Sequence, residues 1–303
     1  MVKNQPDISI VVPVYNSALI IPELIARVQT AIQSSTLTYE LLLTDDCSTD
    51  NSWQIISELS KTNDHVIGLR LSKNNGQWCS TLAGISRASG KYIVTIDDDL
   101  EYGPVDIVKL YNHIISGEHY VVFGMAKEKY LLQGKNERIS RWRKSLVHRL
   151  WSSPPTDSFK IFRRDLVFNG NQFLPTVFLD AFIIHQLDKK FIGYMEVGFN
   201  KRFAGVSNTP FLKKIQLFFL YGFHFALHPE KYVVGLTILF FVCIAATVFL
   251  SVTHTTLSLL LPVASLLLLV TGLLNLYYSL GIFSKTKQLP LYLIVEEVSK
   301  KSI

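Results

Sequence analysis

The 303-residue sequence is poor in cysteine and lacks the patterns that cysteine supports. Its three cysteines, Cys47, Cys79 and Cys243, are scattered along the chain, so we expect neither a disulfide framework nor a cysteine metal motif. No ligand spacing is found among the histidines His113, His119, His148 and His185. Internal repeats and low-complexity tracts are absent as well. These absences exclude a disulfide-rich scaffold, a cysteine zinc site and a repeat protein.

The N-terminal segment also lacks the apolar core of a secretory signal peptide. Asp7 and Pro13 fall where that core would run, so we expect the first domain to stay in the cytosol. The net charge of +6 is spread along the chain instead of forming one basic patch, so no nucleic-acid partner is expected. The basic residues that flank the apolar C-terminal part favour contact with a membrane surface instead.

Charged residues are missing from two long apolar stretches, 232–252 and 257–283. Each exceeds the roughly 20 residues that a helix needs to cross a bilayer. The polar segment "THTT" at 253–256 separates them, so the pair predicts a transmembrane helical hairpin. The alternative is a pair of buried core helices. Lys and Arg flank the pair on both sides and are absent from the turn, which predicts a multi-pass protein of the cytoplasmic (inner) membrane with both termini in the cytosol.

We therefore expect three parts in the chain. Residues 1–207 form a cytosolic domain, residues 208–231 an interfacial amphipathic helix, and residues 232–303 the hairpin with a cytosolic tail. Packing of the 209–228 segment on the domain is the alternative to a membrane-interface position. For the basic amphipathic segment 136–151 the two alternatives have equal support. The sequence leaves the oligomeric state open, and a homo-oligomer is compatible with it.

Residues 7–125 alternate between buried strands and helices. The strand segments are "DISIVVPV", "YELLLT", "VIGLRL", "KYIVTI" and "YVVFGM", and helical patterns follow from Pro22 and over 53–59, 77–88 and 105–115. In the first helix the apolar residues Leu24, Ile25, Val28 and Ile32 have helical spacing. This alternation predicts an α/β fold with a mostly parallel sheet that has helices on both faces. Ligands of such sheets bind beyond the carboxyl ends of the strands.

Polar residues follow four of the predicted strands at that edge. They are the segments 13–16, 45–46, 73–76 and 97–99, which read "PVYN", "DD", "KNNG" and "DDD". A turn or a helix cap explains any one of these segments alone. All four at one edge point to a binding site.

The three consecutive carboxylates Asp97, Asp98 and Asp99 repel one another, and a divalent cation would relieve the repulsion. Oxygen ligands suit Mg²⁺ or Mn²⁺, which bind through one or two carboxylates together with substrate phosphates. If the segment is extended, Asp97 and Asp99 share one face and Asp98 points to the other. An Asp-x-Asp pair of this kind serves an enzyme that uses a nucleotide-sugar.

Several segments together resemble family 2 glycosyltransferases with the GT-A fold, and most closely the polyprenyl-phosphate branch of that family. They are "VVPVYN", "LLTDDCSTDNS", "LSKNNGQWCSTLAGISRASGKYIVTIDDDLE", "DSFKIFRRDLV" and "KRFAGVS". The resemblance covers residues 7–283 and implies a UDP- or GDP-sugar as the donor, Mg²⁺ or Mn²⁺ as the cofactor, and polyprenyl phosphate in the lipid bilayer as the acceptor.

The resemblance also implies roles for individual residues. Pro13 and Tyr15 would line the base and ribose pocket, with Asn16 beside them, and Asp45 or Asp46 would bind the base. Lys73 fills the basic position before "NNG". Asp98 would lie near the ribose or the sugar, Asp97 and Asp99 around the metal with Glu101 as a further oxygen ligand, and Arg202 on phosphate.

Three positions depart from the family pattern, and each affects the predicted site. Ser17 stands where Glu is frequent, Glu101 where Gln is frequent, and 205–208 reads "GVSN" where "GESK" is frequent. The first departure weakens the inferred nucleotide contact, and the last removes an acidic and a basic group near the acceptor. Donor or acceptor preference therefore differs from that of close relatives.

The sequence thus predicts a metal-dependent inverting glycosyltransferase that acts on polyprenyl phosphate at the cytosolic face, with Asp99 and Asp157 as catalytic candidates. One alternative is a membrane glycosyltransferase with a glycan hydroxyl acceptor, in which Asp157 acts as the base. Another is a non-catalytic nucleotide-sugar-binding membrane module. A turn role explains Asp157 equally well, and we expect Asp180 to be a helix cap or a surface group.

Overall fold

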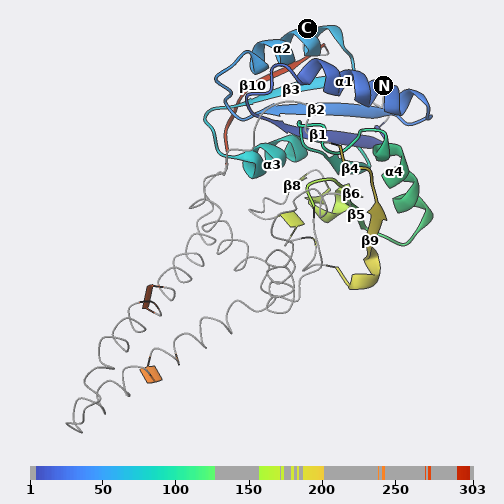
Figure 1. The fold of residues 1–303 in the computed structure, drawn as a ribbon, viewed down its shortest axis with the longest axis vertical. Coiled ribbons are helices and arrows are strands. Elements are labelled where there is room, and N and C mark those ends of the chain that lie inside the picture. The colour runs from blue at the N-terminus through green and yellow to red at the C-terminus, as the bar shows by residue number, and fades with distance from the viewer. Residues whose placement is uncertain are drawn as a thin grey trace, which may run out of the picture. The chain divides into compact units, whose positions relative to one another are not determined.

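The structure is a computed structural model of the whole chain (Figure 1). It describes residues 5–126, 157–170, 172–173, 179–180, 183, 187–200, 238, 241–242, 270, 272–273 and 292–300. The chain divides into two compact units. One contains Met1–Leu146, Pro154–Asn208 and Pro290–Ile303, and the other contains Val147–Ser153 and Thr209–Leu289. Almost all described residues belong to the first unit, and the account below concerns that unit.

An eight-stranded sheet is the centre of this unit, with the order β10-β3-β2-β1-β4-β6-β5-β9. Its strands are β1 (Ile8–Val14), β2 (Tyr39–Asp45), β3 (Val66–Leu71), β4 (Tyr92–Thr95), β5 (Val121–Met125), β6 (Lys160–Arg163), β9 (Ile192–Glu196) and β10 (Ile294–Ser299). The strands β1 to β4 are parallel, β5 is parallel to β9, and only β6 and β10 pair antiparallel with their neighbours. The predicted, mostly parallel sheet is confirmed.

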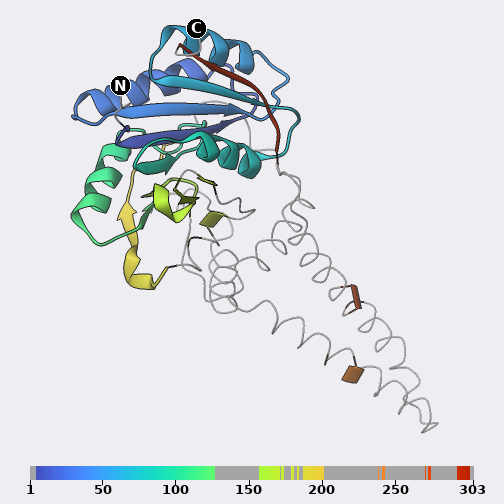
Figure 2. The same cartoon turned by 180° about the vertical axis from the view of Figure 1, so that it is seen from behind.

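Four helices within residues 5–126 also lie where the sequence predicts them. They are α1 (Ile21–Gln33), α2 (Ser52–Thr62), α3 (Gln77–Arg87) and α4 (Asp106–Ser116). Smaller elements are the 3₁₀ turns η1 (Arg164–Leu166) and η2 (Lys189–Phe191) and the short pair β7 (Phe168–Asn169) and β8 (Gln172–Phe173). The helices α1 and α2 lie on one side of β1–β3 and α3 lies on the other, as both views show (Figures 1 and 2). The sheet is therefore covered on both faces, as an apolar parallel sheet requires.

The strand β1 is buried along its whole length and supplies both halves of the core. Ile10 and Val12 belong to the apolar cluster that includes Leu24 and Val28 of α1. Val11 faces the opposite side, where a Cβ added at Gly84 of α3 would lie 2.4 Å from its Cγ1. A glycine at this position therefore lets α3 approach the strand closely enough to cover it.

The C-terminal segment contains a strand that the sequence reading did not include. Within the predicted cytosolic tail, β10 pairs antiparallel with β3 and forms an outer strand of the sheet, while the location of the tail stays a prediction. The segment "IVEEVS" contains β-branched residues, but its partner strand lies more than two hundred residues earlier in the chain, so the local sequence does not show the pairing.

Among the residues that the structure describes, no helix is both long enough and apolar enough to cross a membrane. The predicted spans 232–252 and 257–283 lie almost entirely outside these residues, and so do the segments 136–151 and 208–231. The predicted domain boundaries and the membrane hairpin therefore stay predictions.

Candidate functional site

The loops that follow β1, β2, β3 and β4 lie at the same edge of the sheet, because these four strands are parallel neighbours. Each loop contains one residue with left-handed backbone, at Asn16 (φ 54°), Cys47 (φ 57°), Gly76 (φ 88°) and Leu100 (φ 58°). Such a conformation is uncommon for residues other than glycine and persists only where the surroundings hold it. We call these four loops the rim, and it is the candidate site.

The first two rim loops are tied to each other by side chains. Asn16 Oδ1 accepts a hydrogen bond from the backbone N–H of Thr49 at 2.9 Å, and the N–H of Asn16 donates to Ser48 Oγ at 3.0 Å. The N–H of Ser17 donates to Ser52 Oγ at 2.9 Å. Asn16 therefore connects the first rim loop to the second, whether or not it also contacts a ligand.

Asp45 and Asp46 are both buried and both point into the protein. The N–H of Ser48 lies 3.2 Å from each Asp45 carboxylate oxygen, and the Nε of Arg70 lies 3.6 Å from Asp45 Oδ2. Asp46 accepts hydrogen bonds from the N–H groups of Asn75 and Gly76, each at 2.8 Å. Burial raises the pKa of each carboxyl, while these partners act in the opposite direction. The two side chains thus hold the second and third rim loops.

The three aspartates after β4 do not continue the extended conformation of the strand, which the prediction of a shared face requires. The strand ends at Thr95, and Asp98 and Asp99 lie in the turn that leads to the left-handed Leu100. The prediction that Asp97 and Asp99 share a face because the segment is extended is therefore wrong in its premise. The direction of each aspartate side chain therefore follows from its own hydrogen-bond partners and not from strand alternation.

Asp97 and Asp98 accept hydrogen bonds from different segments. Asp97 accepts hydrogen bonds from Gln77 Nε2 at 2.6 Å and from Ser158 Oγ at 2.7 Å. Asp98 accepts one from Ser17 Oγ at 2.5 Å. Ser17, which departs from the family pattern, therefore connects the end of β1 to the aspartate turn. Sequence reasoning assigned no role to Gln77 or Ser158, although both lie inside segments that carry the family resemblance, and it did not foresee the contact between Ser17 and Asp98.

The pKa values of two carboxyls in this cluster, Asp97 and Asp98, are strongly raised. Burial, followed by the neighbouring charges of Asp99, Asp98 and Asp157, raises the pKa of Asp97 to about 7, against the effect of the Ser158 hydrogen bond. Burial and the charge of Asp99 raise the pKa of Asp98 to about 6, although Ser17 acts in the opposite direction. Several partly buried carboxylates thus lie close together, and a cation there would favour their ionised forms.

Asp157 joins this cluster from the start of β6. Its Oδ2 accepts a hydrogen bond from the Tyr102 hydroxyl at 2.6 Å, and its Oδ1 accepts one from the N–H of Ser158 at 2.8 Å. Ser158 Oγ also contacts Asp97, so one hydroxyl connects the two carboxylates. The structure therefore brings the catalytic candidate Asp157 next to the aspartate turn, which the sequence could not show.

A buried ion pair between Lys160 and Asp180 contacts the backbone of Asp157. Lys160 Nζ is 2.9 Å from Asp180 Oδ1 and 3.3 Å from the backbone oxygen of Asp157. Only 2% of Lys160 and 4% of Asp180 are exposed, so the expectation of a surface position for Asp180 is wrong. Burial and the charge of Asp157 raise the pKa of Asp180, while Lys160 lowers it. The apolar neighbours in "FLDAFII" were the sequence signal that this aspartate is buried.

The chemistry of the aspartate turn fits a hard divalent cation. Mutually repelling carboxylates offer oxygen ligands, and Mg²⁺ takes one or two of them together with substrate phosphates. Within the residues that the structure describes, no three His, Cys, Asp or Glu side chains are arranged as a complete metal site. Asp97, Asp99 and Glu101 as a three-residue ligand set therefore stay a prediction.

The remaining candidate residues lie around this cluster or outside the described part. Pro13 is buried in β1, while Tyr15 is 47% exposed at the strand end and Lys73 is exposed in the third loop. The N–H of Glu101 donates to Asp99 Oδ1 at 3.1 Å, which places Glu101 in the same turn. Arg202 lies outside the described residues.

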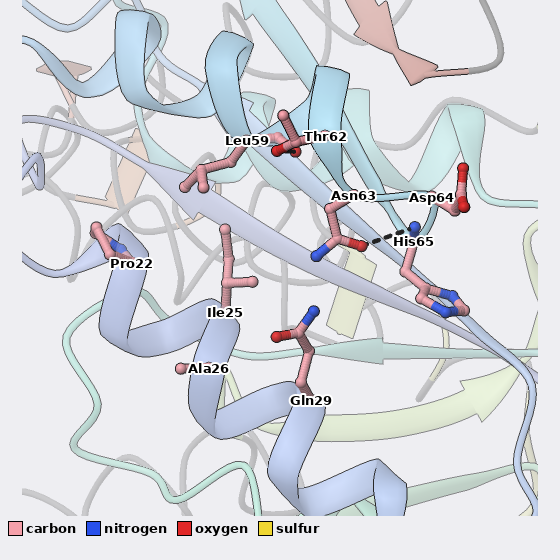
Figure 3. Close-up of a pocket in the computed structure, with 9 residues that line it drawn as sticks. All are labelled: Pro22, Ile25, Ala26, Gln29, Leu59, Thr62, Asn63, Asp64 and His65. Atoms are coloured by element: carbon pink, nitrogen blue, oxygen red, sulfur yellow. Dashed lines mark hydrogen bonds between the residues drawn. The ribbon is translucent and has the colours of Figure 1, made fainter.

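A separate hollow of about 500 Å³ lies between α1 and α2 (Figure 3). Its lining includes Ile25, Leu59 and the segment 63–65, in which the N–H of His65 donates to Asn63 Oδ1 at 3.0 Å. This segment precedes β3, so that end of the hollow lies at the edge of the sheet opposite the rim. We do not count it as part of the candidate site.

Comparison with known proteins agrees with the geometry of the rim. The model of the family "Glycosyl transferase family 2" matches residues 9–172, which contain all four rim loops and Asp157. The chain belongs to glycosyl transferase family 2. The predictions of a glycosyltransferase and of the GT-A type of sheet are thereby confirmed, and the acceptor is not specified by this family.

Two solved structures have the same fold as this family 2 chain. Glucosyl-3-phosphoglycerate synthase from Mycobacterium tuberculosis, in complex with Mn²⁺ and uridine-diphosphate-glucose, is 17% identical with a TM-score of 0.53. The match covers 73% of this chain and 80% of that one. Mannosyl-3-phosphoglycerate synthase from Rubrobacter xylanophilus is 14% identical with a TM-score of 0.56, and the match covers 75% of each chain.

Proposed function

We propose that this chain is a metal-dependent inverting glycosyltransferase that moves a sugar from a UDP- or GDP-sugar onto polyprenyl phosphate at the cytosolic face of a membrane. The family supports sugar transfer. A solved structure of the same fold holds Mn²⁺ and UDP-glucose, which supports the proposed cofactor and donor. The lipid acceptor and the membrane location rest on the two uncharged apolar stretches in the sequence.

The carboxylate cluster is the observation that carries the proposal. Asp97, Asp98, Asp99 and Asp157 lie together at the strand ends, and burial together with the repulsion from the other three carboxylates raises the pKa of Asp97 to about 7. A protein that needed these residues only for its fold would gain nothing from that repulsion. In the proposed enzyme, Asp97 and Asp99 hold a divalent cation, which when bound offsets the charge of the departing nucleoside diphosphate.

In the proposed reaction, an oxygen of the acceptor phosphate forms a new bond to the anomeric carbon of the sugar. The bond from that carbon to the nucleoside diphosphate breaks on the opposite face, and the diphosphate leaves with the electron pair. A phosphate monoester is already largely anionic at neutral pH, because its second pKa is about 6. The transfer therefore needs no strong general base. Asp157 instead helps to position the Asp97 carboxylate, because Ser158 Oγ contacts both carboxylates.

A glycan hydroxyl acceptor is the second candidate. The names of the two structural neighbours describe synthases whose products carry the sugar on 3-phosphoglycerate, so the fold serves more than lipid acceptors. With a hydroxyl acceptor, Asp157 would have to take up the proton. The apolar stretches favour the lipid phosphate, because a soluble acceptor gives no reason for two uncharged stretches of this length.

The test uses mass spectrometry of lipid products after membranes with the full-length chain are incubated with a panel of nucleotide-sugars. The matched inactive control is Asp99→Asn, which keeps the shape of the side chain and removes its charge. A second variant replaces residues 209–289 by a flexible Gly/Ser linker and keeps residues 290–303. Truncation after Glu230 is unsuitable, because it would also remove β10 and leave the edge of β3 uncovered.

We expect a glycosylated polyprenyl phosphate with the full-length chain and none with Asp99→Asn. The linker variant should keep its affinity for the nucleotide but transfer poorly to membrane-embedded lipid. Arg202→Lys should impair transfer even with residues 209–289 present, because a guanidinium matches phosphate geometry better than an ammonium does. Equal rates of the linker variant and the full-length chain on a soluble hydroxyl acceptor, with Arg202→Lys neutral in both, would refute the lipid-phosphate proposal.

A further inference from the structure

The strand β10 joins the C-terminal segment to the half of the sheet that contains β3, β2 and β1. It pairs with β3 in a register that places Glu296 opposite Arg70, and the N–H of Ser72 donates to the backbone oxygen of Leu293 at 2.9 Å. Figure 1 shows β10 running beside β3. The strand β3 leads into the third rim loop, so β10 lies next to an element that positions the rim.

Glu296 and Asp45 hold the same arginine from two sides. Glu296 Oε1 lies 3.1 Å from Nη1 of Arg70, while Arg70 Nε lies 3.6 Å from Asp45 Oδ2. The second oxygen of Glu296 accepts a hydrogen bond from Trp53 Nε1 at 3.2 Å, and the guanidinium lies 5.6 Å from the Trp53 ring centroid. The arginine is thus clamped between the C-terminal strand and the buried end of β2.

The Asp45 end of this chain of contacts belongs to the rim. Asp45 is fully buried and accepts from the N–H of Ser48, which closes the loop that contains the left-handed Cys47. Ser48 in turn accepts from the N–H of Asn16 at the end of β1. Burial raises the pKa of Asp45, and the hydrogen bonds from Ser48 and the charge of Arg70 act in the opposite direction, so Arg70 is the cation that favours the buried carboxylate. The position of Arg70 therefore affects two rim loops.

We propose that Glu296 is a positioning residue for the donor nucleotide: it holds Arg70 against Asp45 and so keeps the first two rim loops in their binding arrangement. The proposal rests on the proposed function, because it assumes that these loops bind the nucleotide of the donor. It gives the C-terminal segment a role in donor affinity, besides completing the sheet.

Glu297 offers a matched control on the same strand. Successive side chains of a strand point to opposite faces, and Glu297 pairs with Arg87 at the end of α3, with 3.1 Å between Nε and Oε2. The side chains of Glu296 and Glu297 are similarly exposed, at 48% and 46%. A substitution at either position therefore has a similar effect on the strand, but only Glu296 is connected to the rim.

The experiment compares Glu296→Gln and Glu297→Gln in the full-length chain. The affinity for UDP and for GDP is measured calorimetrically in the presence of Mn²⁺, and the melting temperature is measured on the same samples. We expect Glu296→Gln to weaken the affinity for the preferred nucleotide about three- to tenfold and Glu297→Gln to change it less than twofold. In transfer assays, Glu296→Gln should raise the donor KM and leave kcat unchanged, because the reacting groups are untouched.

A double-mutant cycle with Arg70 tests the path of the effect. In the Arg70→Met background, Glu296→Gln should cause no further loss, since the residue through which it acts is gone. Arg70→Lys serves as the background if Arg70→Met fails to fold. Additive losses, a loss of affinity that follows the melting temperature in both glutamate variants, or normal affinity in Glu296→Gln would each overturn the inference. If the unmodified chain binds neither UDP nor GDP, the proposed donor site itself is refuted.

Discussion

Asp97→Asn should make the metal-free protein more stable at neutral pH. The pKa of Asp97 is raised from 3.8 to about 7 by burial and by the charges of Asp99, Asp98 and Asp157. A carboxyl with a raised pKa binds its proton more tightly in the folded state than in the unfolded state. Stability is therefore lost as the pH rises from about 4 to about 7, where the folded protein must give up that proton.

The expected gain in the free energy of unfolding follows from the size of this pKa shift. About three pKa units correspond to an upper limit of about 4 kcal/mol, at about 1.4 kcal/mol for each unit. Asp97 is only partly buried, and solvent screens its charge, so we expect about 1–2 kcal/mol at pH 7.5. The asparagine can keep both hydrogen bonds, because the Gln77 amide and the Ser158 hydroxyl can each act as donor or acceptor. The melting temperature should then rise by about 3–6 °C.

The assay is thermal unfolding of the full-length chain in detergent, followed by tryptophan fluorescence between pH 5 and 7.5. In EDTA, the unmodified chain should lose stability over this range and Asp97→Asn should lose less. Mn²⁺ should stabilise the unmodified chain more at pH 7.5 than at pH 5 and should have little effect on Asp97→Asn. Asp64→Asn, which removes a carboxylate from the opposite edge of the sheet, is the control and should follow the unmodified chain. Equal melting temperatures of Asp97→Asn and the unmodified chain at pH 7.5 in EDTA would refute the reasoning.

Two other substitutions test separate parts of the unit. Asp46→Ala leaves the N–H groups of Asn75 and Gly76 without their acceptor, so the affinity for UDP or GDP should fall about tenfold in calorimetry, and an unchanged affinity would contradict the assigned loop role. Lys160→Met leaves Asp180 as an unpaired buried anion and should cost about 3–5 kcal/mol in chemical unfolding. The double variant Lys160→Met/Asp180→Leu should recover most of that loss, and a single variant as stable as the double would show that the pair is unimportant.

The pattern of apolar residues along the sequence was sufficient to predict the strands and helices that have an apolar run or stripe of their own. The strands β1 to β5 and the helices α1 to α4 lie within a few residues of their predicted positions, because each has a continuous apolar run or an apolar stripe of its own. The strand β10 has neither: its residues are charged or partly exposed, and its stability comes from pairing with β3. A strand that is defined by a distant partner cannot be found by reading its own sequence.

The rule that ligands bind at the carboxyl ends of parallel strands placed the candidate site correctly at the rim. It did not show which side chains face outward. Asp45 and Asp46 look alike in "TDDCSTD", yet one pairs with an arginine of the next strand and the other with two backbone groups of the next loop. The ion pair of Lys160 and Asp180 escaped prediction for the same reason, because it joins β6 to a residue far from it in sequence.

The aspartates of the rim therefore divide into two groups with different physical tasks. Asp45 and Asp46 are buried, accept hydrogen bonds from backbone N–H groups and hold loops, so they act whether or not a ligand is present. Asp97 and Asp98 are partly exposed, and burial together with the charge of Asp99 raises the pKa of both. Only the second group gains stability when a cation arrives. The buried first group holds the neighbouring loops through backbone hydrogen bonds, and these loops keep the cluster of like charges together at the strand ends.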